Sequence, residues 1–255
     1  MADRIAVFSG TSDGRKIASM LSEEFSRTRP GTTVSEYVAT DYGRDLAGEE
    51  SGIDVRSGRL NENEMERELG DVCLVIDATH PFATEVTMNI REASEKLGIR
   101  YLRLLREETM TEDGVTLVAD TEEAAEYLSG REGNVLLTTG SKELHKYSKA
   151  GPERLFARVL PLESSITQAR DAGIPVKNII GMQGPFTDDF NRALIRFYNI
   201  DIMVTKDSGA EGGFDDKIRA ARESGVECVV IRRPGEEGYP LGKIFELAKE
   251  FMECM

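Results

Sequence analysis

The sequence predicts an α/β protein of two domains, each with a mainly parallel β-sheet covered by helices. Three observations support this prediction. Short β-rich apolar runs alternate with longer helical patterns, which is typical of βαβ units. Most of these runs lack an alternating polar face, as strands do when helices cover both sides of a sheet. The length of 255 residues fits two domains of roughly 100–150 residues each.

The first half of the chain is expected to form one sheet. Its strands are expected at Arg4 to Phe8, Thr33 to Ala39, Ile53 to Ser57, Val72 to Ile76 and Arg100 to Leu104. A helix follows the first strand, because Ile17, Leu21 and Phe25 recur at helical spacing. A second helix precedes the last strand and is expected to end at Gly98, since glycine is favoured at helix C-termini.

The second half repeats this pattern after an expected helix over Thr121 to Ser129. Its strands are expected at Val135 to Thr138, Phe156 to Val159, Asn178 to Met182, Ile202 to Val204 and Cys228 to Ile231. A helix around Lys217 to Glu223 precedes the last strand. The charged, turn-rich residues Glu107 to Gly114 approach the domain boundary, which we place near Ala119. The expected domains are therefore residues 1–119 and 120–255.

Composition and charge exclude several classes of partner. The formal net charge of −14 argues against nucleic acid and against an anionic membrane surface. A small anionic ligand stays possible, because salt screens distant charge within roughly 8 Å. The longest apolar runs are far shorter than the ~20 residues of a membrane helix, and the first residues do not resemble a signal peptide. Three cysteines and two histidines without metal-type spacing predict no metal site and fit a reducing cytoplasm.

The candidate site residues follow the strands, because ligands of parallel sheets bind beyond the carboxyl ends of the strands. The first strand is followed by the residues Ser9-Gly10-Thr11-Ser12-Asp13-Gly14-Arg15. A glycine-rich turn that leads into a helix start favours phosphate binding, because the free N–H groups of the helix attract anions. The alternative is an ordinary turn in which Ser12 or Asp13 caps the helix.

A second candidate segment is Asp77 to Ala83, which follows an apolar strand directly. His80 within it is a candidate proton donor, since the pKa of a histidine lies close to operating pH. An equally good interpretation is that Asp77 caps the next helix and His80 hydrogen-bonds its own turn. On the following strand Arg103 and Arg106 alternate with leucines, which makes contact with an anion plausible.

The second half offers two further loops. Leu136 to Tyr147 contain a strand, a Thr-Thr-Gly-Ser turn and a helix start, so they form an equally good cradle for phosphate or carboxylate, to which Lys142 adds a positive charge. Val204 to Gly213 crowd a lysine, an aspartate, a serine and three glycines into one loop. Ordering such a loop costs conformational entropy, which favours a binding role over a plain connection.

Taken together, these segments resemble the precorrin-6A reductase family of cobalamin biosynthesis. The resemblance runs in order through GTSDGR, DATHPFA, YLRLLR, LLTTGSKEL, RVLP, GPFT and VTKDSG, and it ends at Arg232 and Arg233. It implies two Rossmann-like domains with the active site in the cleft between them. It also implies hydride transfer from a nicotinamide cofactor to one double bond of precorrin-6A or of its cobalt-containing counterpart, a tetrapyrrole polycarboxylate.

The resemblance and the strand-end positions together assign the site. Possible proton donors, besides solvent, are His80, Lys206 and Asp207. The residues expected to bind the cofactor are Gly10, Thr11, Ser12, Gly14, Thr139, Gly140 and Ser141. The residues expected to bind the substrate are Arg103, Arg106, Lys142, Arg158, Lys206, Ser208 and Gly209. An exchange of cofactor and substrate between the loops fits the sequence equally well.

NADPH is the expected cofactor, with NADH open. Thr40, Asp41 and Arg44 offer both an acid for a ribose hydroxyl and an arginine for a 2′-phosphate. Two other functions fit less well: a corrinoid-pathway methyltransferase that uses a glycine-rich loop for an adenosyl cofactor, and a non-catalytic tetrapyrrole-binding protein. The crowded 204–213 loop argues against a mere carrier. The sequence leaves the oligomeric state and the presence of cobalt in the substrate open.

Overall fold

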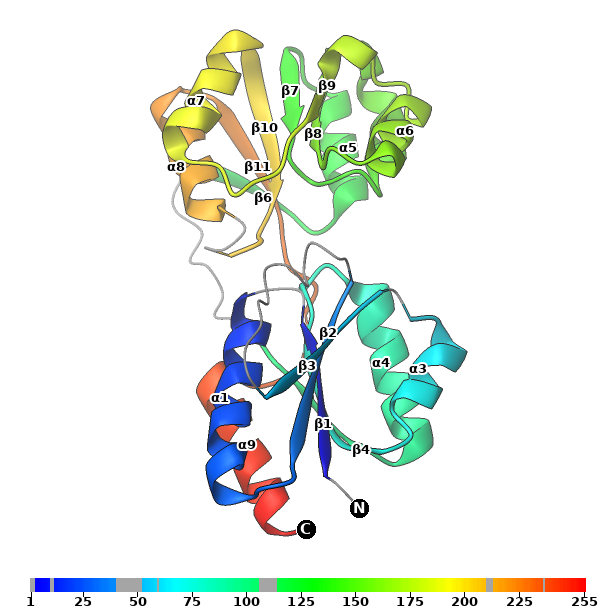
Figure 1. The fold of residues 1–255 in the computed structure, drawn as a ribbon. Coiled ribbons are helices and arrows are strands. Elements are labelled where there is room, and N and C mark those ends of the chain that lie inside the picture. Colours follow the sequence, from blue (N-terminus) through cyan, green and yellow to red (C-terminus); the bar gives the residue numbers. More distant parts are fainter. Residues whose placement is uncertain are drawn as a thin grey trace. The chain divides into compact units, whose positions relative to one another are not determined.

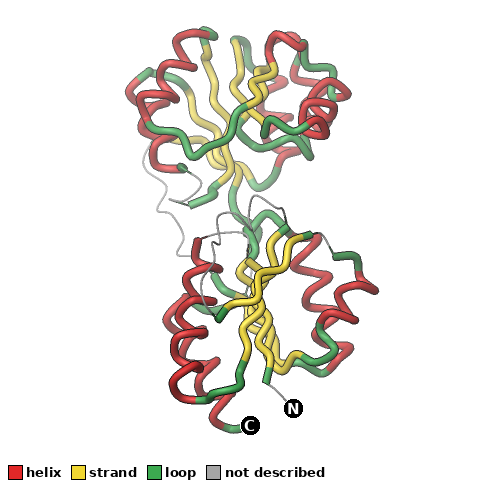
Figure 2. Tube along the Cα trace, in the orientation of Figure 1, coloured by secondary structure: helices red, strands yellow, loops and turns green. Residues whose placement is uncertain are grey.

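The structure is a computed structural model that describes residues 3–9, 12–39, 52–58, 60–105, 114–209, 213–235 and 237–255. Contacts divide the chain into two compact units. Unit 1 comprises Met1–Glu107 and Gly235–Met255, and unit 2 comprises Glu108–Pro234. Each unit has one sheet with helices on both faces (Figures 1 and 2). The prediction of an α/β fold with two mainly parallel, Rossmann-like sheets is confirmed.

Unit 1 has a five-stranded parallel sheet in the order β3-β2-β1-β4-β5. Its strands are β1 (Arg4–Ser9), β2 (Thr33–Val38), β3 (Ile53–Ser57), β4 (Val72–Ala78) and β5 (Arg100–Arg103). Its helices are α1 (Ser12–Thr28), α3 (Glu62–Glu68), α4 (Thr84–Leu97) and α9 (Leu241–Glu253). One core lies between the sheet and α1 with α9, and the other lies between the sheet and α3 with α4 (Figure 1). The expected helix end at Gly98 is present, with φ of 66°.

The end of the chain returns to unit 1 beside β5. The backbone N–H of Tyr239 donates to the carbonyl of Arg103, and the N–H of Leu105 donates to the carbonyl of Tyr239, both at 2.9 Å. A Cβ at position 238 would lie 2.4 Å from the Arg103 carbonyl oxygen, so this close approach requires Gly238. The segment then enters α9, which packs on α1 (Figure 1).

Unit 2 has a six-stranded parallel sheet in the order β6-β11-β10-β7-β8-β9. Its strands are β6 (Val115–Val118), β7 (Asn134–Leu137), β8 (Leu155–Val159), β9 (Ile179–Gly181), β10 (Ile200–Lys206) and β11 (Glu227–Ile231). Its helices are α5 (Thr121–Ser129), α6 (Glu163–Asp171), α7 (Asp188–Phe197) and α8 (Phe214–Glu223), with short 3-10 turns η1 (Leu144–Ala150), η2 (Pro152–Arg154) and η3 (Val176–Asn178). A core of apolar side chains, aromatic ones among them, joins α7 and α8 to one face of the sheet.

The expected domain division near Ala119 differs from these contacts in two respects. Strand β6, which precedes Ala119, pairs with β11 in the sheet of unit 2. Helix α9 buries Ile244, Ala248 and Met252 in the core that contains α1, so it belongs to unit 1. Both differences depend on contacts between residues far apart in the sequence, which a reading of local patterns does not detect.

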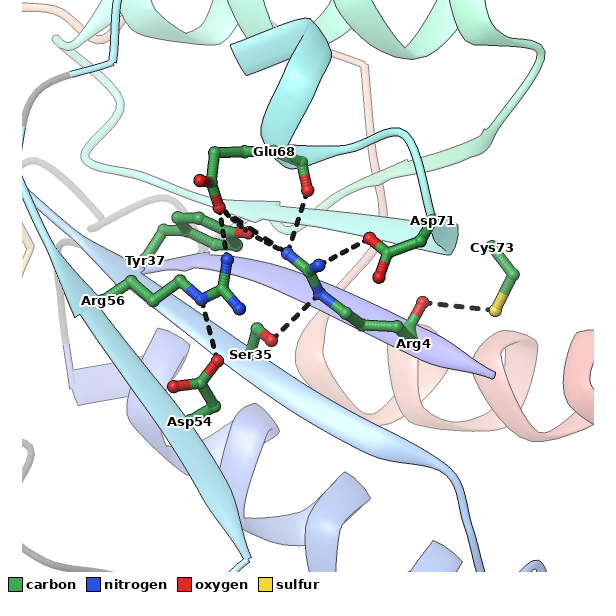
Figure 3. A network of polar contacts seen from close by, with 8 residues as sticks. All are labelled: Arg4, Ser35, Tyr37, Asp54, Arg56, Glu68, Asp71 and Cys73. Carbon is green, nitrogen blue, oxygen red and sulfur yellow. Dashed lines mark hydrogen bonds and ion pairs between the residues drawn. The ribbon is translucent and has the colours of Figure 1, made fainter. Parts of the chain in front are cut away.

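A polar network joins β1, β2 and β3 to the end of α3 (Figure 3). The Arg4 guanidinium donates to Ser35 Oγ at 3.2 Å, to Asp71 Oδ1 at 2.5 Å and to the Glu68 carbonyl at 2.9 Å. It also contacts the Tyr37 hydroxyl, which donates to Glu68 Oε2 at 3.2 Å. Its members lie on several elements of unit 1, and none of them is an expected ligand-binding residue. We therefore interpret the network as structural.

Candidate functional site

Each sheet has one topological switch point, where two neighbouring strands send their connections in opposite directions. In unit 1 this point lies between β1 and β4, because β1 connects to β2 on one side and β4 connects to β5 on the other. In unit 2 it lies between β7 and β10, which connect to β8 and to β11. Ligands of open α/β sheets bind beyond the strand ends at such points. These four strands lead into four loops that the sequence analysis singled out. The loops lie in the regions 9–15, 77–83, 138–142 and 206–213, after β1, β4, β7 and β10.

At the switch point of unit 1, α1 starts close against the end of β1. A Cβ added at Gly14 would lie 2.4 Å from Ser9 Oγ and 3.0 Å from Ser9 Cα. Only glycine permits this approach, which is the role of the third glycine in dinucleotide-binding turns. Ser12 is the first residue of α1, and its helix N-terminus suits an anionic group. The residues present thus fit a dinucleotide cofactor, although Gly10 and Thr11 lie outside the described residues.

A buried ion pair lies at the end of β4. Asp77 is 0 % exposed and Arg103, on the adjacent β5, is 2 % exposed. Arg103 Nη1 donates to Asp77 Oδ1 at 2.7 Å and to Thr79 Oγ1 at 3.0 Å. The Tyr101 hydroxyl donates to Asp77 Oδ2 at 2.9 Å. The guanidinium of Arg103 is therefore paired inside the fold, and this geometry favours a structural role over direct contact with substrate.

The same network holds the turn that carries His80. The Thr79 hydroxyl donates to Asp77 Oδ1 at 2.7 Å and contacts Thr87 Oγ1 of α4 at 3.0 Å. His80 Nδ1 accepts the backbone N–H of Phe82 at 3.2 Å, so the neutral ring carries its proton on Nε2. The hydrogen bond of His80 within its own turn is thus present, and proton donation by His80 stays a prediction. Arg106 lies outside the described residues.

At the switch point of unit 2, Thr138 ties β7 to β10. Its N–H and its hydroxyl both donate to the Val204 carbonyl at 2.9 Å. Gly140 and Gly209, in the two loops beyond these strands, have φ of 82° and 72°, which favours glycine at both positions. The 138–142 and 206–209 loops therefore start side by side. Thr139 and Ser141 are partly buried there, and Lys142 is exposed.

Lys206 is neutralised by an acidic neighbour. Its ammonium donates to Glu143 Oε2 at 2.7 Å, and Lys146 donates to Glu143 Oε1 at 2.6 Å. Burial raises the pKa of Glu143, but the hydrogen bonds from Lys146 and Lys206 outweigh it and hold the pKa at about 2. Lys206 therefore faces a firmly ionised carboxylate, which reduces the positive charge that it can offer to a ligand.

Asp207 is also paired. Arg233 donates through Nε to the Asp207 carbonyl at 3.0 Å and through Nη2 to Asp207 Oδ1 at 2.9 Å. Ser208 is buried beside it, and a Cβ at Gly209 would lie 3.2 Å from Arg233 Nη2. The 207–209 loop is thus packed against Arg233, which stands at the end of the resemblance described above. Residues 210–212 of the predicted loop lie outside the described residues.

Arg158 has different surroundings. It is 7 % exposed near the end of β8, and its Nη1 donates to Asn191 Oδ1 at 2.7 Å. Its guanidinium lies over the Phe186 ring, 4.3 Å from the centroid. Burial lowers the pKa of Arg158 to about 10. Lys217 of α8 is 8 % exposed and was not singled out from the sequence, because a lysine in an amphipathic helix usually lies on the solvated face.

Among the described residues, no group of three or more histidine, cysteine or acidic side chains is placed to hold a metal ion. Among the described helices, none is long and apolar enough to cross a membrane.

Comparison with known proteins gives matches along nearly the whole chain. The family model described as precorrin-6x reductase CbiJ/CobK matches residues 4–254. A cobalt-precorrin-6A reductase from Priestia megaterium is 36% identical over 258 residues, covering 98% of this chain and 97% of that protein. One from Salmonella typhimurium is 37% identical over 239 residues, covering 90% of this chain and 87% of that protein. A solved structure of CobK precorrin-6A reductase has a TM-score of 0.73 at 22% identity, covering 98% of this chain and 97% of that chain, and shows a shared fold.

Proposed function

Because the chain belongs to the precorrin-6x reductase CbiJ/CobK family, we propose that it reduces one macrocycle double bond of cobalt-precorrin-6A with a nicotinamide cofactor. The observation that carries this proposal is the identity of 36% to a cobalt-precorrin-6A reductase over 98% of the chain. The chain is accordingly an oxidoreductase of cobalamin biosynthesis. The cobalt-containing form is proposed over the metal-free form because the relatives at 36% and 37% identity carry that name, whereas the solved structure named precorrin-6A reductase is 22% identical.

We place the cofactor at the turn between β1 and α1. The close approach of Gly14 to Ser9 supports this placement, since it lets a helix N-terminus face a phosphate at the strand end. The Thr139-Gly140-Ser141 loop is proposed to share in binding the cofactor, with exchange of the two ligands as the alternative. When bound, the nicotinamide supplies a hydride; the protein positions the two ligands and supplies the electrostatic environment.

The reduction also adds a proton to the ring, and we propose His80 as its source. His80 lies beyond the end of β4, next to β1 at the switch point. The donor is its imidazolium form, which carries a proton on each ring nitrogen, and donation from Nε2 followed by loss of the Nδ1 proton to solvent returns the neutral ring whose Nδ1 accepts the Phe82 N–H. The ion pairs of Lys206 with Glu143 and of Asp207 with Arg233 favour His80 over these two candidates. Solvent is the competing source. A His80→Gln variant separates the two, because the pH dependence of turnover changes only if His80 donates the proton.

The proposed function is tested by mixing the purified protein with cobalt-precorrin-6A and NADPH without oxygen. We expect NADPH oxidation, and a product that carries deuterium when the cofactor is labelled with deuteride. Labelling by adenosylmethionine in place of reduction would show a methyltransferase. Ring binding without oxidation of NADPH or NADH would show a carrier.

The preference for NADPH is part of the same proposal. The residues that offer an acid for a ribose hydroxyl and an arginine for a 2′-phosphate, Thr40, Asp41 and Arg44, lie outside the described residues. Parallel kinetics with NADPH and NADH test the preference, and equal kcat/KM values for the two cofactors would contradict it. A cytoplasmic location is likewise proposed, because the three free cysteines Cys73, Cys228 and Cys254 fit a reducing compartment.

A further inference from the structure

Arg158 is a buried cation for which the described part of the chain provides no carboxylate. Its one hydrogen bond goes to a neutral amide, and its other polar contact is the face of Phe186. A buried charge normally pairs with an opposite charge, because desolvation alone costs several kcal/mol. The lowered pKa of Arg158, with burial as its cause, agrees with this picture. The fold therefore contains a desolvated guanidinium near the carboxyl end of β8, where ligands of parallel sheets bind, and an anion bound there would pair with its charge.

The guanidinium is held in one orientation. Asn191 is fully buried in the first turn of α7, and its Nδ2 donates to the carbonyls of Phe186 at 3.4 Å and Thr187 at 3.0 Å. These bonds fix the amide so that Oδ1 faces Arg158. The Phe186 ring lies beside the guanidinium carbon, and Asn191 accepts from Nη1, so the other N–H donors of the planar fork are the ones that a ligand would meet. In-plane donors in a fork are what a carboxylate binds in bidentate fashion.

Lys217 adds a second cation on the same side of the sheet. Arg158 follows Phe156 by two positions, so both side chains face α7 and α8, and Phe156 packs in the core that includes Ile218 of α8. Burial, and then the positive charge of Arg158, lower the pKa of Lys217 to about 8. The charge of Arg158 thus reaches Lys217, and an anion bound at Arg158 would favour the charged form of Lys217 as well.

We propose that Arg158 and Lys217 form a buried site for one carboxylate arm of the tetrapyrrole, with Asn191 and Phe186 as positioning residues. This inference rests on the proposed function, since it names part of the substrate that the chain takes. A phosphate of the cofactor is also an anion and could occupy the same site. We assign the site to a substrate carboxylate because we place the cofactor's phosphates at the turn around Gly14 in unit 1.

The test measures binding of the oxidised tetrapyrrole and of NADPH, each alone, to the full chain by fluorescence titration. We expect Arg158→Met to weaken tetrapyrrole binding roughly 10- to 100-fold and to leave the Kd of NADPH within about twofold. Lys217→Met should weaken tetrapyrrole binding by a smaller factor. The matched control is Arg170→Met, which removes an exposed arginine of α6 and should change neither Kd.

A second variant keeps the test decisive if Arg158→Met folds poorly. Asn191→Asp places a carboxylate beside Arg158, and this ion pair offsets the lost Nδ2 hydrogen bonds to Phe186 and Thr187. The carboxylate occupies the anion site, so tetrapyrrole binding should weaken, and circular dichroism checks that the variant is folded. Unchanged tetrapyrrole affinity in folded Arg158→Met and Asn191→Asp overturns the proposal. Loss of NADPH affinity in place of tetrapyrrole affinity also overturns it and assigns the site to a phosphate. Failure of the proposed function would appear differently, as wild-type protein that binds the ring but oxidises no cofactor.

Discussion

Arg103 in unit 1 and Arg158 in unit 2 occupy similar places near the ends of parallel strands, yet their partners differ. Arg103 meets the carboxylate of Asp77 at 2.7 Å, whereas Arg158 meets the neutral amide of Asn191 at the same distance. Both side chains are more than nine-tenths buried. The charge of the partner therefore separates an arginine that completes the fold from one that is suited to an external anion.

The largest expected effect comes from breaking the pair in unit 1. Asp77→Asn leaves Arg103 buried without its carboxylate, so we expect unit 1 to lose roughly 3–5 kcal/mol of unfolding free energy. Urea unfolding followed by circular dichroism measures this loss. Arg158→Met is the counterpart in unit 2 and should cost far less or stabilise the unit, because it removes a buried charge that lacks a carboxylate. Equal losses in the two variants would contradict the comparison.

The next effect depends on pH and concerns Lys217. Its pKa lies at about 8 in the folded protein, below the ordinary value of 10.5, because burial and Arg158 disfavour the charged form. The unfolded chain binds more protons between these values, so Lys217 makes the unfolding free energy rise with pH across that window. We expect the Lys217→Met variant to lack this slope, and its stability relative to wild type to fall by roughly 2–3 kcal/mol from pH 7.5 to 10.5.

The control for this measurement removes a coupled neighbour. Burial raises the pKa of Cys228 to about 12 and the charge of Lys217 lowers it, so wild type and Lys217→Met are also compared in a Cys228→Ala background, in which the thiol makes no contribution. A difference in unfolding free energy that does not change with pH would show that Lys217 is charged in the folded state throughout.

A smaller effect tests whether unit 1 holds the cofactor. Gly14→Ala forces a Cβ to within 2.4 Å of Ser9 Oγ, so we expect a loss of roughly 1–3 kcal/mol in stability and weaker binding of NADPH than of tetrapyrrole. The matched control is Gly242→Ala in α9, where an added Cβ meets no atom within 4 Å. That variant should be neutral or slightly stabilising. Weaker tetrapyrrole binding alone in Gly14→Ala would assign unit 1 to the substrate.

The smallest expected effect concerns a cation that is paired but partly accessible. Glu143→Gln removes the carboxylate beside Lys206, so tetrapyrrole binding should tighten by up to about threefold if Lys206 contacts the substrate. Lys206→Ala should raise the apparent KM for the tetrapyrrole, because it removes this cation from the substrate. Steady-state kinetics measure the KM for the tetrapyrrole in both variants. If this KM changes in neither Glu143→Gln nor Lys206→Ala, Lys206 has no part in substrate binding.

The sequence was sufficient for the described strands other than β6 and for the loops that follow them, because apolar runs and glycine-rich turns are local signals. It could not separate Arg103 from Arg158, since the partner that decides each role lies 26 or 33 positions away. It gave no signal for Lys217, whose burial depends on the packing of α8. Strand β6 was missed because Val115–Val118 follow a charged, turn-rich stretch and show their role only through pairing with β11.

The return of the chain to unit 1 after unit 2 has a consequence for synthesis. Helix α1 packs its apolar face against α9, and α9 follows the whole of unit 2 in the chain. During translation unit 2 is therefore made before α9 can cover Ile17, Leu21 and Phe25. We expect unit 2 to fold first, and nascent unit 1 to expose an aggregation-prone apolar surface until α9 packs on it.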